Sequence, residues 1–277
     1  MYPYEFVEES WRHRAGDPRA RSVALRKGVT SPVDVFRVEF ERQQEGIDSK
    51  RCNVVDSDVF IWARGEPDAR WATKIGGVPH RPTDKPWPRY TVRNGSAIST
   101  RPMTFLAQFC FNDGVKANLD LPGDVLLVFV KDDEFADYDS VELEWHSLEV
   151  RKPMRAEDVP QQRWEIKCCH GYRWRTWDVA PVDGSRGSPK VLRATKIGGV
   201  ASCSDAAFGP HSGDLGRFLC QLAEISPATT VPFPWINVEG ALARGRFRSG
   251  DLSLGDAGVL CFYLGDHHVV NWRFECY

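Results

Sequence analysis

Hydrophobic positions along the chain gather in short runs, and Gly, Pro, Asn and Asp bound most of these runs. Runs of this length that are rich in Val, Phe, Ile and Trp are typical of β-strands. Few segments show the spacing of an amphipathic helix. The pattern predicts strands over 54–62, 105–111, 125–130, 141–150, 163–170, 218–225, 259–264 and 269–275.

Two other segments follow different patterns. Ser31, Pro32 and Asp34 suit the cap, first position and first turn of a helix, which is therefore expected to run to about Gln44. The segment 79–102 is rich in proline at its start, which predicts a long loop with little regular structure. Within it, we expect Trp87 to cover part of the core.

One hexamer occurs twice: Ala72-Thr73-Lys74-Ile75-Gly76-Gly77 returns unchanged over 194–199. Each copy is followed by an apolar strand that carries one glutamine, and then by a Gly-Asp turn that opens a second apolar strand. A repeated order of this kind indicates an internal duplication. We therefore predict two similar strand-rich halves that pack into one body, since a sheet with one apolar face needs a neighbour to cover it.

The predicted fold class is α+β and mainly β. Residues 1–50 are expected to form a partly helical N-terminal extension. Residues 51–183 form the first repeat and residues 184–277 the second, with a Gly/Ser/Pro cluster at the boundary.

The repeated polar residues have two interpretations. A Gly-Gly pair at a strand end suits either a tight structural corner or a ligand-facing turn, and the duplication favours the corner, because one ligand seldom needs two copies. Lysines at such corners are ordinarily solvated. The two strand glutamines must find partners if they are buried, either by bridging loops or by lining a cleft between the halves. The candidate cleft residues are Lys74, Gln108, Lys196 and Gln221.

Composition narrows the possible partners. Thirty-six basic and 38 acidic residues leave a net charge of −2, so there is no overall field to hold nucleic acid or an anionic membrane. The N-terminus lacks the features of a secretory signal and no window has the apolar length of a membrane span. These features predict a cytoplasmic protein whose eight cysteines are reduced thiols.

No constellation of residues indicates catalysis, a cofactor or a metal. The nearest approach to a ligand cluster is Cys168-Cys169-His170, in which alternation along a strand would let only Cys168 and His170 share a site. The spaced Cys and His pairs of zinc sites, the glycine-rich nucleotide loops and the Gly-x-Ser-x-Gly elbow are all missing.

The densest charge lies directly after Lys131. It suits either a solvated loop or an acidic lip with two aromatic anchors that faces a basic protein surface. The candidate partner-binding residues are Asp132, Asp133, Glu134, Phe135, Asp137, Tyr138 and Asp139.

The motifs together resemble the YwqG-like family of bacterial proteins. The likeness covers roughly residues 50–277, and the first 50 residues lie outside it. In the first half, the matching residues are Lys74 to Gly77, Trp87-Pro88, Phe105 to Gln108, Leu121 to Asp124 and Leu126 to Phe129. In the second half, they are Lys196 to Gly199, Leu219 to Gln221, Gly255 to Gly258 and Leu260 to Phe262.

The resemblance implies a cytoplasmic α+β fold with an internal duplication and no catalytic residues to carry over. Genes of this family often lie beside those of bacterial toxins, which implies a non-enzymatic immunity protein that binds a toxin encoded nearby. The alternative is a small-ligand-binding protein or an enzyme that uses the cleft between the repeats.

Overall fold

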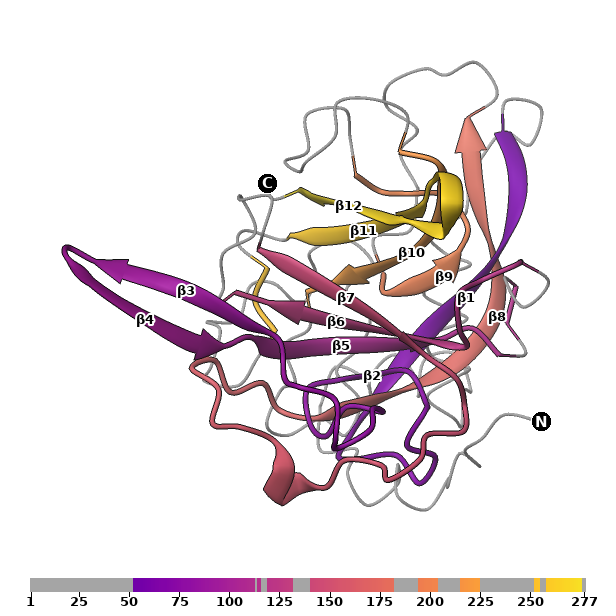
Figure 1. The fold of residues 1–277 in the computed structure, drawn as a ribbon. Helices are drawn as coiled ribbons and strands as arrows, with labels where there is room; N and C mark the ends of the chain where they lie inside the picture. The colour runs from indigo at the N-terminus through magenta and orange to yellow at the C-terminus, as the bar shows by residue number, and fades with distance from the viewer. Residues whose placement is uncertain are drawn as a thin grey trace, which may run out of the picture.

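A ten-stranded antiparallel sheet organises the protein (Figure 1). The structure, a computed structural model, describes residues 52–112, 114–115, 119–131, 140–181, 194–203, 215–224, 252–254 and 258–275. The strands of the first part are β1 (Cys52–Arg64), β2 (Lys74–Ile75), β3 (Arg89–Asn94), β4 (Ala97–Pro102), β5 (Thr104–Cys110), β6 (Val125–Val130) and β7 (Val141–His146). Those of the second part are β8 (Cys169–Pro181), β9 (Lys196–Gly198), β10 (Arg217–Ala223), β11 (Val259–Leu264) and β12 (Val270–Glu275).

The arrangement of strand types is the same from either end of the sheet: three outer strands, then a short strand, then a long strand. It runs β12-β11-β10-β9-β1-β8-β2-β5-β6-β7, so the long strands β1 and β8 form the centre and a short strand lies outside each of them. The connections cross at this centre, because β2 pairs with β8 and β9 pairs with β1. Each repeated hexamer therefore lies against the long strand that is more distant in the sequence.

Strands β6 and β11 are buried on both faces, which explains their continuous hydrophobic runs. Every side chain of β5 and β6 is buried. Alternate residues of β6 enter different clusters: Leu126 and Val128 belong to the main core, and Leu127 and Phe129 belong to a second cluster beneath Trp87. Trp87 covers this second cluster, as expected from the sequence.

The sheet curls so that its two ends face each other across the main core. Phe109 of β5 and Phe262 of β11 pack with ring centroids 5.9 Å apart, although five strands lie between β5 and β11 in the sheet order. The same cluster takes Leu126 from one end and Leu260 from the other. The two ends of the sheet thus share one core.

The mainly β prediction is confirmed, and most of the predicted strands are present. The only helical segments in the described part are single 3₁₀ turns at Ala156–Asp158 and Asp266–His268. No helix there is long and apolar enough to cross a membrane. The helix predicted at 31–44 and the domain boundary predicted at 183 lie outside the described residues.

Three predictions about regular structure are wrong. The segment 79–102 is not an irregular loop throughout, because its second half forms the β3–β4 hairpin. The alternating residues 164–168 are not a strand, since β8 begins at Cys169. The Lys-Ile steps of both hexamers, expected as turns, are short strands, because they make ladder bonds with neighbours on both sides.

Candidate functional site

The first hexamer forms a corner that is stabilised by a buried lysine and a partly exposed glutamate. Gly76 and Gly77 have φ angles of +57° and +75°, a left-handed conformation that glycine adopts without a Cβ clash. Lys74 is 1% exposed; its Nζ donates to Glu66 Oε2 at 2.6 Å and to the Val78 carbonyl. Glu66 Oε1 accepts from the Val78 amide at 2.6 Å. The lysine and its acid therefore bind each other and the backbone of Val78, which follows the two glycines.

Gln108 stands opposite Lys74 in the ladder and holds the chain on either side of the hexamer. Its Nε2 donates to the carbonyls of Arg70 and Ala72 at 2.8 and 2.7 Å. Its Oε1 accepts from the His80 amide at 2.9 Å. This fully buried amide is thus satisfied by backbone groups of its own corner, as a buried amide must be to avoid a desolvation cost.

The second hexamer forms a similar corner, in which an aspartate takes the place of the glutamate. Gly198 and Gly199 both have a φ of +72°. Lys196 Nζ donates to Asp178, whose Oδ2 also accepts from the Val200 amide at 3.0 Å. Gln221 stands opposite Lys196 in the ladder.

The amide of Gln221 repeats most of the bonds of Gln108. It donates to the Ala194 carbonyl at 2.8 Å and accepts from the Ser202 amide at 3.1 Å. The corners differ in solvation, since Glu66 is 43% exposed whereas Lys196 and Asp178 are both 0% exposed. Burial lowers the pKa of Lys196 in spite of the adjacent carboxylate.

The four candidate cleft residues fall into two separate pairs. Lys74 lies beside Gln108, and Lys196 beside Gln221, but β1 and β8 stand between the two pairs in the sheet. Three strand spacings of about 4.8 Å put them roughly 14 Å apart across the sheet alone. All four side chains are buried, which corrects the expectation that the lysines are solvated.

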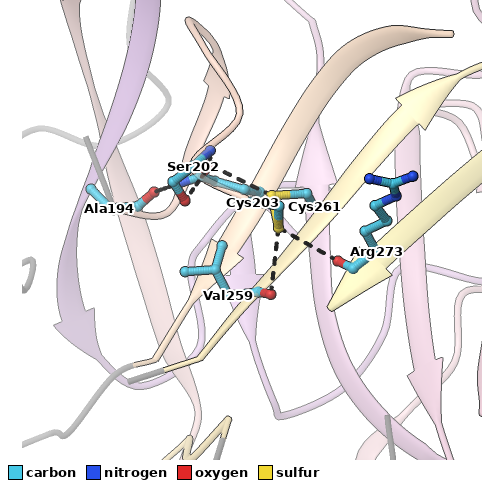
Figure 2. Close-up of a disulfide and its surroundings, with 7 residues drawn as sticks. Ala194, Ser202, Cys203, Val259, Cys261 and Arg273 are labelled. Atoms are coloured by element: carbon cyan, nitrogen blue, oxygen red, sulfur yellow. Dashed lines mark hydrogen bonds between the residues drawn. A yellow bond between two sulfur atoms is a disulfide. The ribbon is translucent and has the colours of Figure 1, made fainter. Parts of the chain in front are cut away.

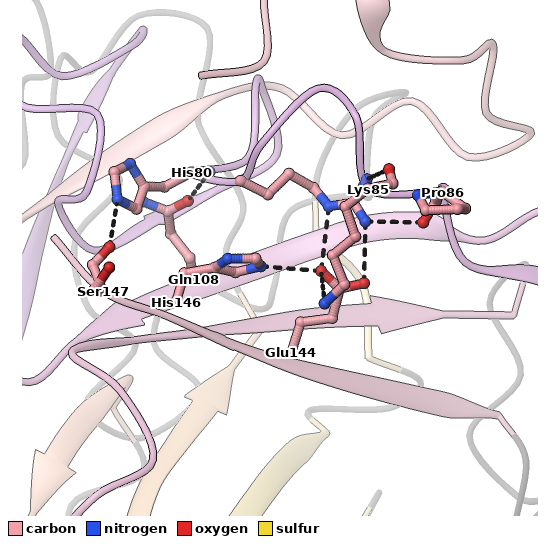
Figure 3. A network of polar contacts seen from close by, with 8 residues as sticks. His80, Lys85, Pro86, Gln108, Glu144, His146 and Ser147 are labelled. Atoms are coloured by element: carbon pink, nitrogen blue, oxygen red, sulfur yellow. Dashed lines mark hydrogen bonds and ion pairs between the residues drawn. The ribbon is translucent and has the colours of Figure 1, made fainter. Parts of the chain in front are cut away.

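A further polar cluster follows the first corner (Figure 3). The Arg81 guanidinium is fully buried and binds both oxygens of Glu144 at 3.1 Å, a paired geometry that favours the charged forms. His146 Nε2 and Lys85 Nζ also lie 3.1 Å from Glu144 Oε2. Burial tends to raise the pKa of Glu144, but the hydrogen bonds from His146 and Arg81 outweigh it and hold the pKa at about 2.

The second corner carries a disulfide at the corresponding place (Figure 2). Arg81 and Cys203 stand the same number of positions after Lys74 and Lys196. Cys261 has the ladder position that Leu127 has in the other half. Leu127 lies between Gln108 and Glu144 in the ladder, and Cys261 lies between Gln221 and Arg273. Cys203 and Cys261 are joined, so the expectation that every cysteine is a reduced thiol is wrong for this pair. An ion pair and a covalent bond therefore fasten equivalent loops.

The Cys168-Cys169-His170 cluster does not form a ligand set. Cys169 is buried in the main core, whereas His170 Nδ1 contacts the Gly65 carbonyl at 2.9 Å. Burial, followed by the charge of Glu66, raises the pKa of the Cys168 thiol, which therefore stays protonated. Across the described residues, no three His, Cys, Asp or Glu side chains are grouped as a metal would require.

The predicted acidic lip, residues 132–139, lies outside the described residues. Its two ends are described. The Lys131 amide donates to the Ser140 carbonyl at 2.9 Å, which closes the β6–β7 connection. Lys131 Nζ lies 6.0 Å from the centre of the Tyr90 ring, so the connection starts beside the base of the β3–β4 hairpin.

The β3–β4 hairpin is a surface feature that the sequence reasoning missed. It projects from the body as a two-stranded ribbon (Figure 1). Ile98 on it is 69% exposed, the largest value among the exposed large hydrophobic residues of the described part. The signal was present in the sequence, because the two-residue turn Gly95-Ser96 between strand-like segments is typical of a tight hairpin. The nearby prolines concealed it.

No family model matches this sequence, and no curated protein is significantly similar to it.

Proposed function

We propose that this protein is a non-enzymatic protein-binding module, and specifically an immunity protein that neutralises a bacterial toxin by direct binding. The observation that carries the proposal is the burial of the repeated polar side chains. Lys74, Gln108, Lys196 and Gln221 are each satisfied within their own corner. Side chains that are buried in this way stabilise the fold and cannot reach a substrate, so a binding site must lie on the surface.

We also propose that the chain contains two copies of one five-strand unit, one built from β1, β2, β5, β6 and β7 and the other from β8 to β12. The Lys74–Gln108 and Lys196–Gln221 ladder pairs support this. Two backbone hydrogen bonds between the proposed copies also support it. The Gly171 amide donates to the Thr73 carbonyl at 2.8 Å, and the Phe60 amide donates to the Thr195 carbonyl at 3.2 Å. The resemblance to the YwqG-like family agrees with this duplication.

The compartment that suits this role is the cytoplasm, where a toxin-producing cell needs its protection. Cys110, Cys169 and Cys220 are buried, where a thiol behaves as a small apolar group. Among the described residues, the Cys203–Cys261 bond favours an oxidising compartment instead. A free-thiol count on protein purified without reductant distinguishes these two environments.

Co-expression with the product of the adjacent open reading frame tests the proposed function. We expect rescue of growth and one complex on size exclusion. Converting Asp132, Asp133 and Glu134 to their amides should weaken the complex, whereas converting the exposed Glu142, Glu149 and Glu157 should leave it intact. Failure to co-elute and to rescue growth would contradict the proposal, as would a metabolite that raises the melting temperature as a tight ligand does.

A further inference from the structure

We propose that the β3–β4 ribbon is a docking arm, on which an extended acidic segment of a partner protein adds as a third strand along β3. The inference rests on the proposed function and names the chemistry of its partner. It starts from the shape of the ribbon, whose strands pair only with each other in the described part of the chain. A two-stranded ribbon has two open edges, and an open edge can accept another strand.

The hydrogen-bond pattern determines which backbone groups face the open edges. The Met103 amide donates to the Pro88 carbonyl at 2.9 Å, and this position continues the β3–β4 register. Hydrogen-bonded and non-hydrogen-bonded pairs alternate along an antiparallel ladder. The pairs Arg89–Pro102, Thr91–Thr100 and Arg93–Ile98 are therefore of the second kind. The amide and carbonyl groups of these residues point away from the partner strand.

The edge of β4 is blocked, whereas that of β3 is open. On β4, Pro102 has no amide hydrogen, and the Thr100 carbonyl already accepts from the Arg89 guanidinium at 3.3 Å. On β3, by contrast, Arg89, Thr91 and Arg93 each have an outward amide and carbonyl. All three residues are exposed. A new strand would therefore add along β3.

The two faces of the ribbon also differ, because one packs on the body and the other is exposed. Tyr90 and Val92 of β3 pack against the second cluster and anchor the ribbon to the body. On the opposite face stand Arg89 and Arg93, together with the exposed Ile98. Arg93 is the ladder partner of Ile98, so cationic and apolar surface lie side by side.

Charge identifies the segment that adds to β3 as acidic. Residues 89–102 contain three arginines and no acidic residue, in a chain whose net charge is −2. A strand added along β3 would place its own side chains directly opposite Arg93, where an acidic residue forms a favourable cross-strand pair. Arg89, whose guanidinium contacts the Thr100 carbonyl, adds to the positive charge of this face. Alternate acidic and β-branched residues would match this face.

A protein segment fits better than nucleic acid. Two outward arginines are few beside the roughly six to ten phosphate contacts of a typical DNA-binding protein. The outward amides of β3 can also donate ladder hydrogen bonds to carbonyl groups spaced two residues apart, a spacing that an extended polypeptide supplies. Ile98 has an apolar counterpart in a peptide side chain and none in a phosphate backbone.

The test uses a fluorescein-labelled peptide of about seven residues that alternates Glu and Val, a length that matches one strand. The controls are the same peptide with Lys in place of Glu and a short oligothymidylate. Binding to the full chain is measured by fluorescence anisotropy. Thr91→Pro removes one outward amide and no bond to β4, and Thr91→Val is its matched control, since it keeps that amide. Arg93→Glu reverses one charge.

We expect saturable binding of the acidic peptide to the wild type and to Thr91→Val. Binding should be about tenfold weaker or worse for Thr91→Pro and Arg93→Glu, both checked for native melting temperature. The inference is overturned if the acidic peptide does not bind, if Thr91→Pro binds as well as Thr91→Val, or if either control ligand binds more tightly.

The same variants separate this inference from the proposed function. If the complex with the neighbouring gene product forms and is unaffected by Thr91→Pro and Arg93→Glu, the docking arm is wrong and the binding function stands. If the peptide binds as expected but no complex with that product forms, the arm stands and the toxin-binding function is wrong.

Discussion

Individual residues of the two corners have the same roles but different solvation. Lys74 shares its charge with a half-exposed glutamate, whereas Lys196 and Asp178 are both completely buried. The sequence identifies both lysines and both glutamines as candidate site residues. It could not show their burial, because the two acids lie at different distances before their lysines and form no repeated motif.

This difference predicts unequal costs for the same substitution. Lys196→Met leaves the Asp178 carboxylate buried without its counter-charge, and we expect a loss of about 3–5 kcal/mol in the free energy of unfolding. Lys74→Met should cost less, about 1 kcal/mol, because water can solvate Glu66. Urea denaturation of both variants measures this. Equal losses would mean that solvation of the acid does not control the cost.

Glu144 predicts an acid-dependent loss of stability. Its pKa is about 2 in the folded protein and returns toward the ordinary value of 4.5 on unfolding. The unfolded state therefore binds more protons as the pH falls below 4.5, and the stabilising contribution of Glu144 is lost between about pH 4.5 and 2.

Glu144→Gln should lower stability at neutral pH and make the acid-induced fall in the urea midpoint shallower. Glu142→Gln, at an exposed position on the same face of the same strand, is the matched control and should leave the pH profile unchanged. Parallel profiles for Glu144→Gln and the wild type would rule out this contribution.

At the scale of the elements, length and context decided which strands could be predicted. Strands such as β6 and β11 are continuous apolar runs, and the pattern alone located them. The short strands β2 and β9 carry too few residues to show any period, and they form because neighbours on both sides supply ladder partners. Residues 164–168 alternate like a strand, but the segment passes beneath the first corner, where Ile166 leaves no room for a side chain on Gly76.

The loop after the first corner is held to β7 by the Arg81–Glu144 ion pair, whereas the loop after the second is held to β11 by the Cys203–Cys261 disulfide. Only the second link should therefore be sensitive to a reductant. Cys203 and Cys261 are 58 residues apart, and loop closure over this length contributes roughly 4 kcal/mol by chain entropy. Adding a reductant should lower the urea midpoint of the wild type and leave that of the double variant Cys203→Ser/Cys261→Ser unchanged. An unchanged wild-type midpoint would show that the bond does not form in solution.

At the scale of the whole molecule, the crossed pairing makes the two halves of the chain interdependent. β2 depends on β8, and β9 depends on β1, while both ends of the sheet bury residues in one core. The two ends of the sheet therefore belong to a single body. The sequence did not predict the crossed pairing within it, because that pairing joins residues far apart in the chain.

This interdependence predicts one cooperative unfolding transition. Circular dichroism and tryptophan fluorescence should give the same urea midpoint, as two-state unfolding requires. A fragment of residues 184–277 contains neither β1 nor β8, so it should remain unfolded when expressed alone. Two separated transitions, or a folded fragment, would show that the halves are independent.

The exchange of short strands across the centre also has a historical consequence. Under the proposed duplication, a single five-strand ancestor would have had only one ladder partner for its short strand within its own chain, and would have obtained the second from a sister molecule, as in a swapped homodimer. Gene fusion would then have replaced an association that depends on protein concentration by one that does not. It would also have released each copy from symmetry, so that one could acquire a disulfide and the other a projecting ribbon.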